Sequence, residues 1–163
     1  MLILQAYYGQ EDNQDPICVK SRTGYVLTLG NCPLMWVSKL QGLVTLSTLE
    51  SEYVALSTAM RDLLPTRDLL STVFKSLGLG NLAKPLVQSN VFEDNNGALI
   101  LATSKRITPR TKHIAIKYHH FWSHVGKTVN IQKIESEKNM ADIFTKGLCP
   151  QKFKEIRKLL MNW

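Results

Sequence analysis

A change of hydrophobic period near residue 48 constrains the fold of this chain more than any other feature. Before that point, short runs of β-branched and aromatic residues are separated by turn residues. The runs are "TGYVLTL" (23–29), "PLMWVSKL" (33–40) and "LVTLS" (43–47). Period-two runs with Gly30-Asn31 between the first two predict an antiparallel meander of strands.

After that point, apolar residues recur at helical spacing from Leu49 to Leu64. This spacing predicts a helix, which Pro65 ends or kinks before a second helical stretch from Thr66 to Leu77. The later pattern predicts, in order, a strand over 85–94, a short helix within 95–104, a helix over 113–125, a strand over 128–134 and a closing helix near 153–160. We therefore expect one mixed α/β (α+β) domain spanning residues 1–163.

Composition excludes several classes of protein. No apolar run approaches the roughly 18 residues that a membrane span requires, and the start of the chain lacks the basic region and cleavage site of a signal peptide. The cysteines are widely spaced and form no CxxC motif; they are Cys18, Cys32 and Cys149. This usage predicts free thiols in a reducing compartment, in a protein that is neither secreted nor held in a membrane.

The net charge of +7 is concentrated in one stretch of the sequence. No Asp or Glu occurs between Asp94 and Glu135, whereas that interval holds seven Lys or Arg residues and all four histidines. A basic stretch of this kind is typical of a surface that binds a polyanion such as nucleic acid. The alternative is a solvated face on a basic protein, and the sequence leaves both open.

Four acidic residues are candidates for chemistry. Glu50 fits a capping box with Ser47 at the start of the predicted helix, which accounts for it without catalysis. Glu52 lies beyond the box, where capping no longer requires a carboxylate. Asp94 follows a predicted strand, and Asp142 lies in "NMADIFTKG" (139–147). Each could equally be a solvated, turn-forming or helix-start acid.

Six motifs in series carry a resemblance that covers nearly the whole chain. They are "KSRTGYVLTLG" (20–30), "WVSKLQ" (36–41), "LSTLESEYVAL" (46–56), "EDNNGAL" (93–99), "RTKHIAIKYHHF" (110–121) and "ADIFTKGL" (141–148). In order and spacing they resemble the ribonuclease H domain of Ty1/copia-type retrotransposon Pol polyproteins. The resemblance implies an RNase H-like fold, with a mixed five-stranded sheet flanked by helices.

The resemblance also implies a chemistry. Such domains hydrolyse the RNA strand of RNA–DNA hybrids with two Mg²⁺ (or Mn²⁺) ions held by carboxylates, since these ions prefer oxygen ligands. Carried over by motif, the catalytic metal ligands are Glu52, Asp94 and Asp142. The implied partners are an RNA–DNA hybrid or other nucleic acid and the reverse transcriptase domain of the same polyprotein. The implied compartments are the cytoplasm, within a virus-like particle, and the nucleus.

Nucleic-acid contacts are expected from the basic loop and the segment after it. The candidates are Lys105, Arg106, Arg110, Lys112, His113 and Lys117. His113 could aid product release, but histidines beside an apolar segment more often serve packing or hydrogen bonding.

The family also has a first-strand carboxylate, in an Asp-x-Asp pattern expected at residues 1–3, where this chain has Met-Leu-Ile. Asp12 and Asp15 lie too far along to replace it. We therefore expect a shortened first strand and an impaired enzyme. The alternative is a catalytically silent, transposon-derived remnant that still binds nucleic acid.

Overall fold

The computed structural model describes residues 2–11 by their backbone, and residues 20–30, 32–79, 87–109, 111–114 and 116–163 in full. It contains a five-stranded sheet in the order β3-β2-β1-β4-β5. The strands are β1 (Leu2–Glu11), β2 (Arg22–Leu29), β3 (Cys32–Leu40), β4 (Val87–Glu93) and β5 (Val129–Lys133). The first three are antiparallel, whereas β4 and β5 run parallel to β1.

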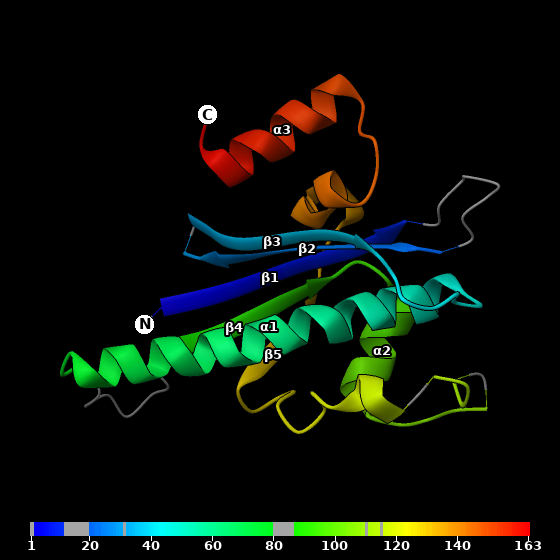
Figure 1. The fold of residues 1–163 in the computed structure, drawn as a ribbon, viewed down its shortest axis with the longest axis horizontal. Helices are drawn as coiled ribbons and strands as arrows, with labels where there is room; N and C mark the ends of the chain where they lie inside the picture. Colours follow the sequence, from blue (N-terminus) through cyan, green and yellow to red (C-terminus); the bar gives the residue numbers. More distant parts are fainter. Residues whose placement is uncertain (1, 12–19, 31, 80–86, 110, 115) are drawn as a thin grey trace.

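Helices lie on both faces of this sheet (Figure 1). The long helix α1 (Thr48–Ser76) covers one face, and α2 (Asn96–Ser104) lies beside its first turns. On the opposite face lie the short 3-10 helix η3 (Met140–Phe144) and the C-terminal helix α3 (Pro150–Met161). The remaining 3-10 helices are η1 (Ile116–His119) and η2 (Ser136–Lys138).

Alternation along β2 divides the core between the two faces. Tyr25 and Leu27 are buried in the larger cluster against α1, while Val26 between them packs with Ile156 and Leu160 of α3. Because successive side chains of a strand point to opposite faces, one strand contributes to both layers. The mixed α/β fold predicted from the order of strands and helices is confirmed.

The first strand is not shortened, contrary to expectation. With ten residues, β1 is longer than any other strand that the structure describes, and it lies at the centre of the sheet. Its register pairs Leu2 with Val87 and Tyr7 with Phe92. Pairing on both edges supplies the backbone hydrogen bonds of a full-length strand, even though its sequence, LILQAYYGQE, alternates poorly.

Helix α1 is continuous through Pro65, where the sequence predicted an end or a kink. A proline removes only one intrahelical donor, and Pro65 lies on the exposed side of the helix. On the buried side, Ala59, Met60 and Leu63 pack in the core immediately before the proline. Tertiary packing therefore outweighs the local penalty of the proline.

Two further predicted elements are wrong. Residues 43–47 form no strand; they lead into α1, and the N–H of Leu46 donates to Oε2 of Glu50 at 2.7 Å. The described residues of the segment 113–125, which leave out residue 115, form η1 and successive turns in place of a helix. The N–H of Trp122 bonds to the carbonyl of His119, an i to i−3 pattern, in a stretch of aromatic and β-branched residues with low helix propensity.

None of the helices in the described part of the chain is both long and apolar enough to cross a lipid bilayer.

Candidate active site

Glu52 is positioned by the start of α1. Ser47 is the N-cap, and its Oγ accepts the N–H of Glu50 at 3.2 Å, as the capping box predicts. The reciprocal bond reaches Leu46 and not the N–H of Ser47, which shifts the expected contact by one residue. With Glu50 engaged in the cap, Glu52 lies two residues further on, where it is only 8% exposed. The division of roles between the two acids is thus consistent with the capping argument.

The end of β4 supplies two adjacent carboxylates. Glu93 is the last residue of the strand and is fully buried, and Asp94 follows it directly. The N–H of Asn95 donates to Oε1 of Glu93 at 2.7 Å. The side chain of Asn95 in turn caps α2, so the chain passes from strand to helix within two residues. The Nζ of Lys133 on β5 donates to the main-chain carbonyl of Asp94 and leaves the Asp94 carboxylate for other contacts.

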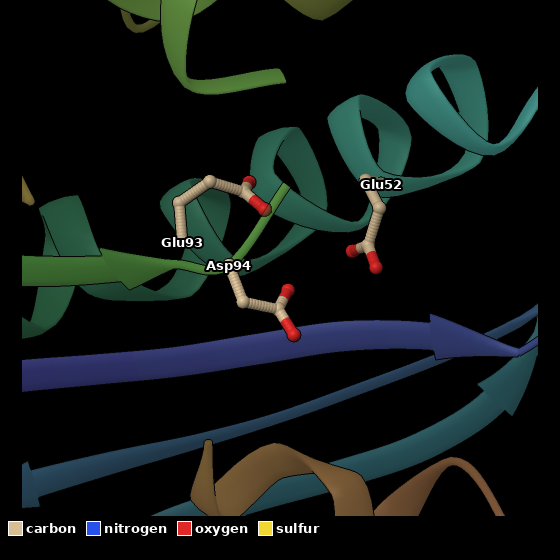
Figure 2. Close-up of side chains that lie close together, drawn as sticks. All are labelled: Glu52, Glu93 and Asp94. Carbon is tan, nitrogen blue, oxygen red and sulfur yellow. The ribbon is translucent and has the colours of Figure 1, made fainter. Parts of the chain in front are cut away.

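These segments bring three carboxylates together. One oxygen from each of Glu52, Glu93 and Asp94 lies within 4.8 Å of the others. Figure 2 shows Glu52 reaching across from α1 toward the two acids at the end of β4, above the ribbon of β1. Gly97 permits this approach, because a Cβ there would lie 2.6 Å from Cδ1 of Leu49 in the first turn of α1. Oxygen ligands clustered at this spacing suit a divalent cation such as Mg²⁺.

Burial governs the charge state of the cluster. It raises the pKa of Glu93 to about 8, and the neighbouring charge of Asp94 adds to the shift. The N–H of Asn95 and the ammonium of Lys133 oppose it. Near neutral pH the protein therefore holds a proton here unless another cation takes its place.

Asp142 lies elsewhere in the fold. It belongs to η3 and is almost completely buried, with Oδ1 3.0 Å from Nζ of Lys146 and Oδ2 2.8 Å from Nζ of Lys152. Among the described residues, the group of carboxylates within 4.8 Å of one another does not include it. The structure thus brings together two of the three expected ligands and holds the third in ion pairs with lysines.

The register of the sheet corrects the expected place of the first-strand carboxylate. Leu2 and Ile3 lie at the end of β1 that pairs with the start of β4, and residue 1 is outside the described residues. Extending the pairing of Tyr7 with Phe92 by two residues brings Gly9 level with Asp94. The chain therefore has glycine at the β1 position beside the cluster.

The basic residues are distributed around the start of α1 and beyond it. Nε2 of His113 lies 3.4 Å from Oε2 of Glu50, next to the turn that carries Glu52. Lys105 ends α2 in a left-handed conformation, and its Nζ donates to the carbonyl of Val125 at 2.9 Å. Arg106 and Lys112 are exposed, and Lys117 lies over the ring of Tyr118. Arg110 lies outside the described residues.

Glu93 was not among the predicted site residues, and the feature that identifies it is its burial in the structure. Along β4, buried residues alternate with half-buried ones, and Glu93 falls on the buried set with Val87, Ser89 and Val91. A carboxylate on the buried face of a strand, directly before Asp94, is unusual enough to mark a site.

Comparison with known proteins places this geometry in context. No protein-family model matches the chain. The chain is 32% identical over 159 residues to the "Retrovirus-related Pol polyprotein from transposon TNT 1-94" of Nicotiana tabacum, and the match covers 97% of the chain and 11% of that protein. It is 29% identical over 154 residues to the corresponding protein of transposon RE1 of Arabidopsis thaliana, covering 94% of the chain and 10% of that protein. The chain thus spans about a tenth of the length of these curated relatives.

Solved structures with the same fold are ribonucleases H. The N-terminal RNase H domain of a Mycobacterium tuberculosis protein superposes with a TM-score of 0.57 at 12% identity, over 97% of this chain and 98% of that one. RNase H1 from Halobacterium salinarum gives 0.56 at 14%, over 88% and 94%. LC11-RNase H1, solved in complex with an RNA/DNA hybrid, gives 0.55 at 18%, over 89% and 94%. The chain therefore has the ribonuclease H fold, and its sequence is similar to one segment of the Pol polyproteins of these plant retrotransposons.

Proposed function

We propose that this domain hydrolyses the RNA strand of RNA–DNA hybrids with the help of divalent metal ions. The observation that carries the proposal is the convergence of Glu52, Glu93 and Asp94 within 4.8 Å at the end of β4. In open sheets of this kind, sites form beyond the carboxyl ends of the parallel strands. The hybrid bound to LC11-RNase H1, which has the same fold, makes the same substrate class the natural candidate here.

The donors at this cluster fit Mg²⁺ or Mn²⁺. All three are carboxylates, with no sulfur or imidazole donor in the group. The raised pKa of Glu93 adds to the fit, because a carboxylate that retains a proton for lack of a counter-charge gains most from a cation. Two such ions, when bound, would supply a nucleophilic water and stabilise the departing oxygen.

We propose that Glu93 takes over the part of the missing first-strand carboxylate. Gly9 contributes no acid at the position level with Asp94, whereas Glu93 brings a third carboxylate to the same end of β4. With Glu93 in place of the family's first-strand carboxylate, the number of carboxylate ligands stays the same, and one of them comes from β4 and not from β1.

Asp142 remains a proposed metal ligand under one condition. Its carboxylate must exchange the ion pairs with Lys146 and Lys152 for a metal ion. Both ammonium groups are partly exposed, so they can turn outward without leaving a buried charge behind. Binding of substrate phosphates by these lysines would release the carboxylate at the same time.

The remaining proposals concern the surroundings of the site. Arg106 and Lys112 are exposed and are suited to contact phosphates, as is Arg110 on sequence grounds. Because the curated relatives are about ten times longer, we propose the reverse transcriptase region of a Pol polyprotein as a partner. Work on nucleic acid during retrotransposition would place the domain in virus-like particles in the cytoplasm, in the nucleus, or in both.

A silent nucleic-acid-binding remnant is the second candidate function. Gly9 beside the cluster favours it, since the loss of a ligand shared by two ions removes charge balance and position together. In that case the basic segment still binds nucleic acid, and no hydrolysis follows.

Cleavage of an end-labelled RNA–DNA hybrid in Mg²⁺ and in Mn²⁺ separates the two candidates. We expect metal-dependent cleavage by the native chain, and loss of at least about a hundredfold in Glu52→Gln. Glu155→Gln, an exposed acid on α3, is the matched control and should cleave normally. Cleavage that persists in Glu52→Gln would point to a contaminating nuclease and contradict the proposal. No cleavage by the native chain, with retained binding, would establish the silent remnant.

A further inference from the structure

A second feature of the molecule lies away from the carboxylates, on the β3 side of α1. A cavity of about 300 Å³ opens between the end of β3, the loop that follows it, helix α1 and η1. We call it the cationic groove. The polar and charged side chains that define it are Thr23, Lys39, Thr58, Arg61, Lys117 and Gln41.

The groove is strongly positive. Lys39 comes from β3, Arg61 from α1 and Lys117 from η1, and no Asp or Glu is among the lining residues. All three cations are exposed, and within the described part of the chain none of them forms an ion pair. Three like charges that converge on one hollow without a counter-ion repel one another, so an anion in the groove is stabilised by all three.

The floor of the groove is built and ordered by hydrogen bonds. Nε2 of Gln41 donates to Oγ1 of Thr23 at 3.0 Å and to the carbonyl of Ser51 at 2.9 Å. The N–H of Gln41 donates to the carbonyl of Ser21 at 2.8 Å. These bonds fix the loop after β3 against both β2 and α1. Lys39 and Arg61 are therefore carried by elements that these hydrogen bonds hold together.

We propose that the cationic groove binds a phosphate group of a nucleic-acid strand, apart from the carboxylate cluster. The proposal rests on the nucleic-acid function proposed above and adds a contact region to it. Lys117 belongs to the stretch between Asp94 and Glu135 that contains no Asp or Glu. The groove therefore includes a residue of the segment whose composition predicts nucleic-acid binding. A strand is favoured over a small anion because the three cations come from three elements around an open hollow.

The groove lies on a different side of α1 from the carboxylate cluster. Arg61 follows Glu52 by nine residues, a separation of roughly 13 Å along the helix axis at about 1.5 Å per residue. At about 3.6 residues per turn, nine residues also place the two side chains on opposite sides of the helix, with Glu52 buried and Arg61 exposed. A phosphate in the groove is therefore a contact separate from the carboxylates.

Hybrid binding in EDTA, measured by fluorescence anisotropy over a range of salt concentrations, tests the groove without cleavage. The test variant is the full chain with Lys39→Gln, Arg61→Gln and Lys117→Gln. The matched control removes three exposed charges elsewhere, with Lys75→Gln, Lys154→Gln and Lys158→Gln. We expect the groove variant to weaken binding about tenfold or more and to reduce the slope of log affinity against log salt by roughly 0.7–0.9 for each lost phosphate contact. The control should stay within about twofold of the native chain, and thermal melts should confirm that both variants fold.

Two outcomes would contradict the proposal that the groove binds a phosphate of a nucleic-acid strand. Equal weakening in both variants would mean that net charge alone governs binding. Loss of inorganic phosphate binding in the groove variant, with unchanged hybrid affinity, would assign the groove to a free anion and not to a strand. The proposed enzymatic function fails separately: groove-dependent binding without cleavage in Mg²⁺ contradicts hydrolysis and leaves the groove assignment intact.

Discussion

At the scale of single residues, the site depends on which acids are buried and which are engaged. Glu50 is tied into the helix cap and to His113, whereas Glu52 faces the acids at the end of β4. Capping logic could separate these two from sequence alone. It could not find Glu93, because the resemblance to a family directs attention to the acid next to it, and only the burial pattern of β4 distinguishes Glu93.

Glu93 should make the stability of the metal-free protein fall with rising pH. Its pKa is about 8 in the folded protein against an ordinary value of 4.5, so between these values the folded state binds more protons than the unfolded state. The free energy of unfolding therefore decreases as pH rises through that window, and the group contributes no change below it. In Glu93→Gln this fall should be smaller. Thermal melts of both proteins in EDTA from pH 4 to 9 measure it, and parallel curves would contradict the assignment.

Restoring an acid on the first strand should increase activity. Gly9 lies level with Asp94, so Gly9→Asp adds a carboxylate where the chain has no side chain. We expect the rate of hybrid cleavage in Mg²⁺ to rise by about tenfold to a hundredfold, because the metal ions gain charge balance and position. Gly9→Asn, of nearly the same size but uncharged, is the control. If Asn and Asp act alike, the effect is one of backbone or packing, and the carboxylate is not responsible.

At the scale of elements, two departures from the expected pattern decide how the layers meet. Helix α1 continues through Pro65, and η3 packs directly on β2. From the sequence, Pro65 predicts an end or a kink in the helix. Whether a proline interrupts a helix depends on the packing around it, which the local sequence does not show. The segment 113–125 likewise repeats apolar residues as a helix does, yet consecutive turns suffice to bury Tyr118 and Phe121. Tertiary contacts of this kind cannot be read from periodicity.

Pro65 is expected to cost α1 stability that an alanine would recover. Pro65→Ala restores the missing N–H and relieves the proline ring in the middle of a helix on its exposed side. The gain in free energy of unfolding should be about 1–3 kcal/mol, after allowance for the greater freedom of the unfolded chain. Urea denaturation measures it. Unchanged or lower stability would mean that the helix is interrupted at this point in solution.

Gly24 should be required for η3 to approach the sheet. A Cβ at this position would lie 2.5 Å from Cγ2 of Thr145 and 2.9 Å from Cβ of Phe144. Gly24→Ala should therefore lower the free energy of unfolding by about 1–3 kcal/mol, the usual cost of overpacking. Gly42→Ala is the control, since a Cβ there meets nothing within 4 Å. Equal stability of the two variants in urea would contradict close packing of η3 on β2.

At the scale of the whole molecule, the fold brings distant segments together at the carboxyl end of β4. The order of strands and helices predicted the mixed sheet and its covering helices, and the family resemblance predicted the RNase H fold. The register of β1 could not be predicted, because its side chains alternate too weakly to fix it. That register moves the expected first-strand acid from residues 1–3 to Gly9 and makes Glu93 the third carboxylate of the cluster.

Binding of Mn²⁺, followed by electron paramagnetic resonance, tests the central claim most directly, because it does not depend on catalysis. The native chain should bind the ion saturably, and Glu93→Gln should weaken binding by about tenfold or more through loss of a charged oxygen ligand. Glu155→Gln on the exposed side of α3 should bind as the native chain does. Equal affinity of the native chain and Glu93→Gln would contradict the claim that Glu52, Glu93 and Asp94 together form a metal site.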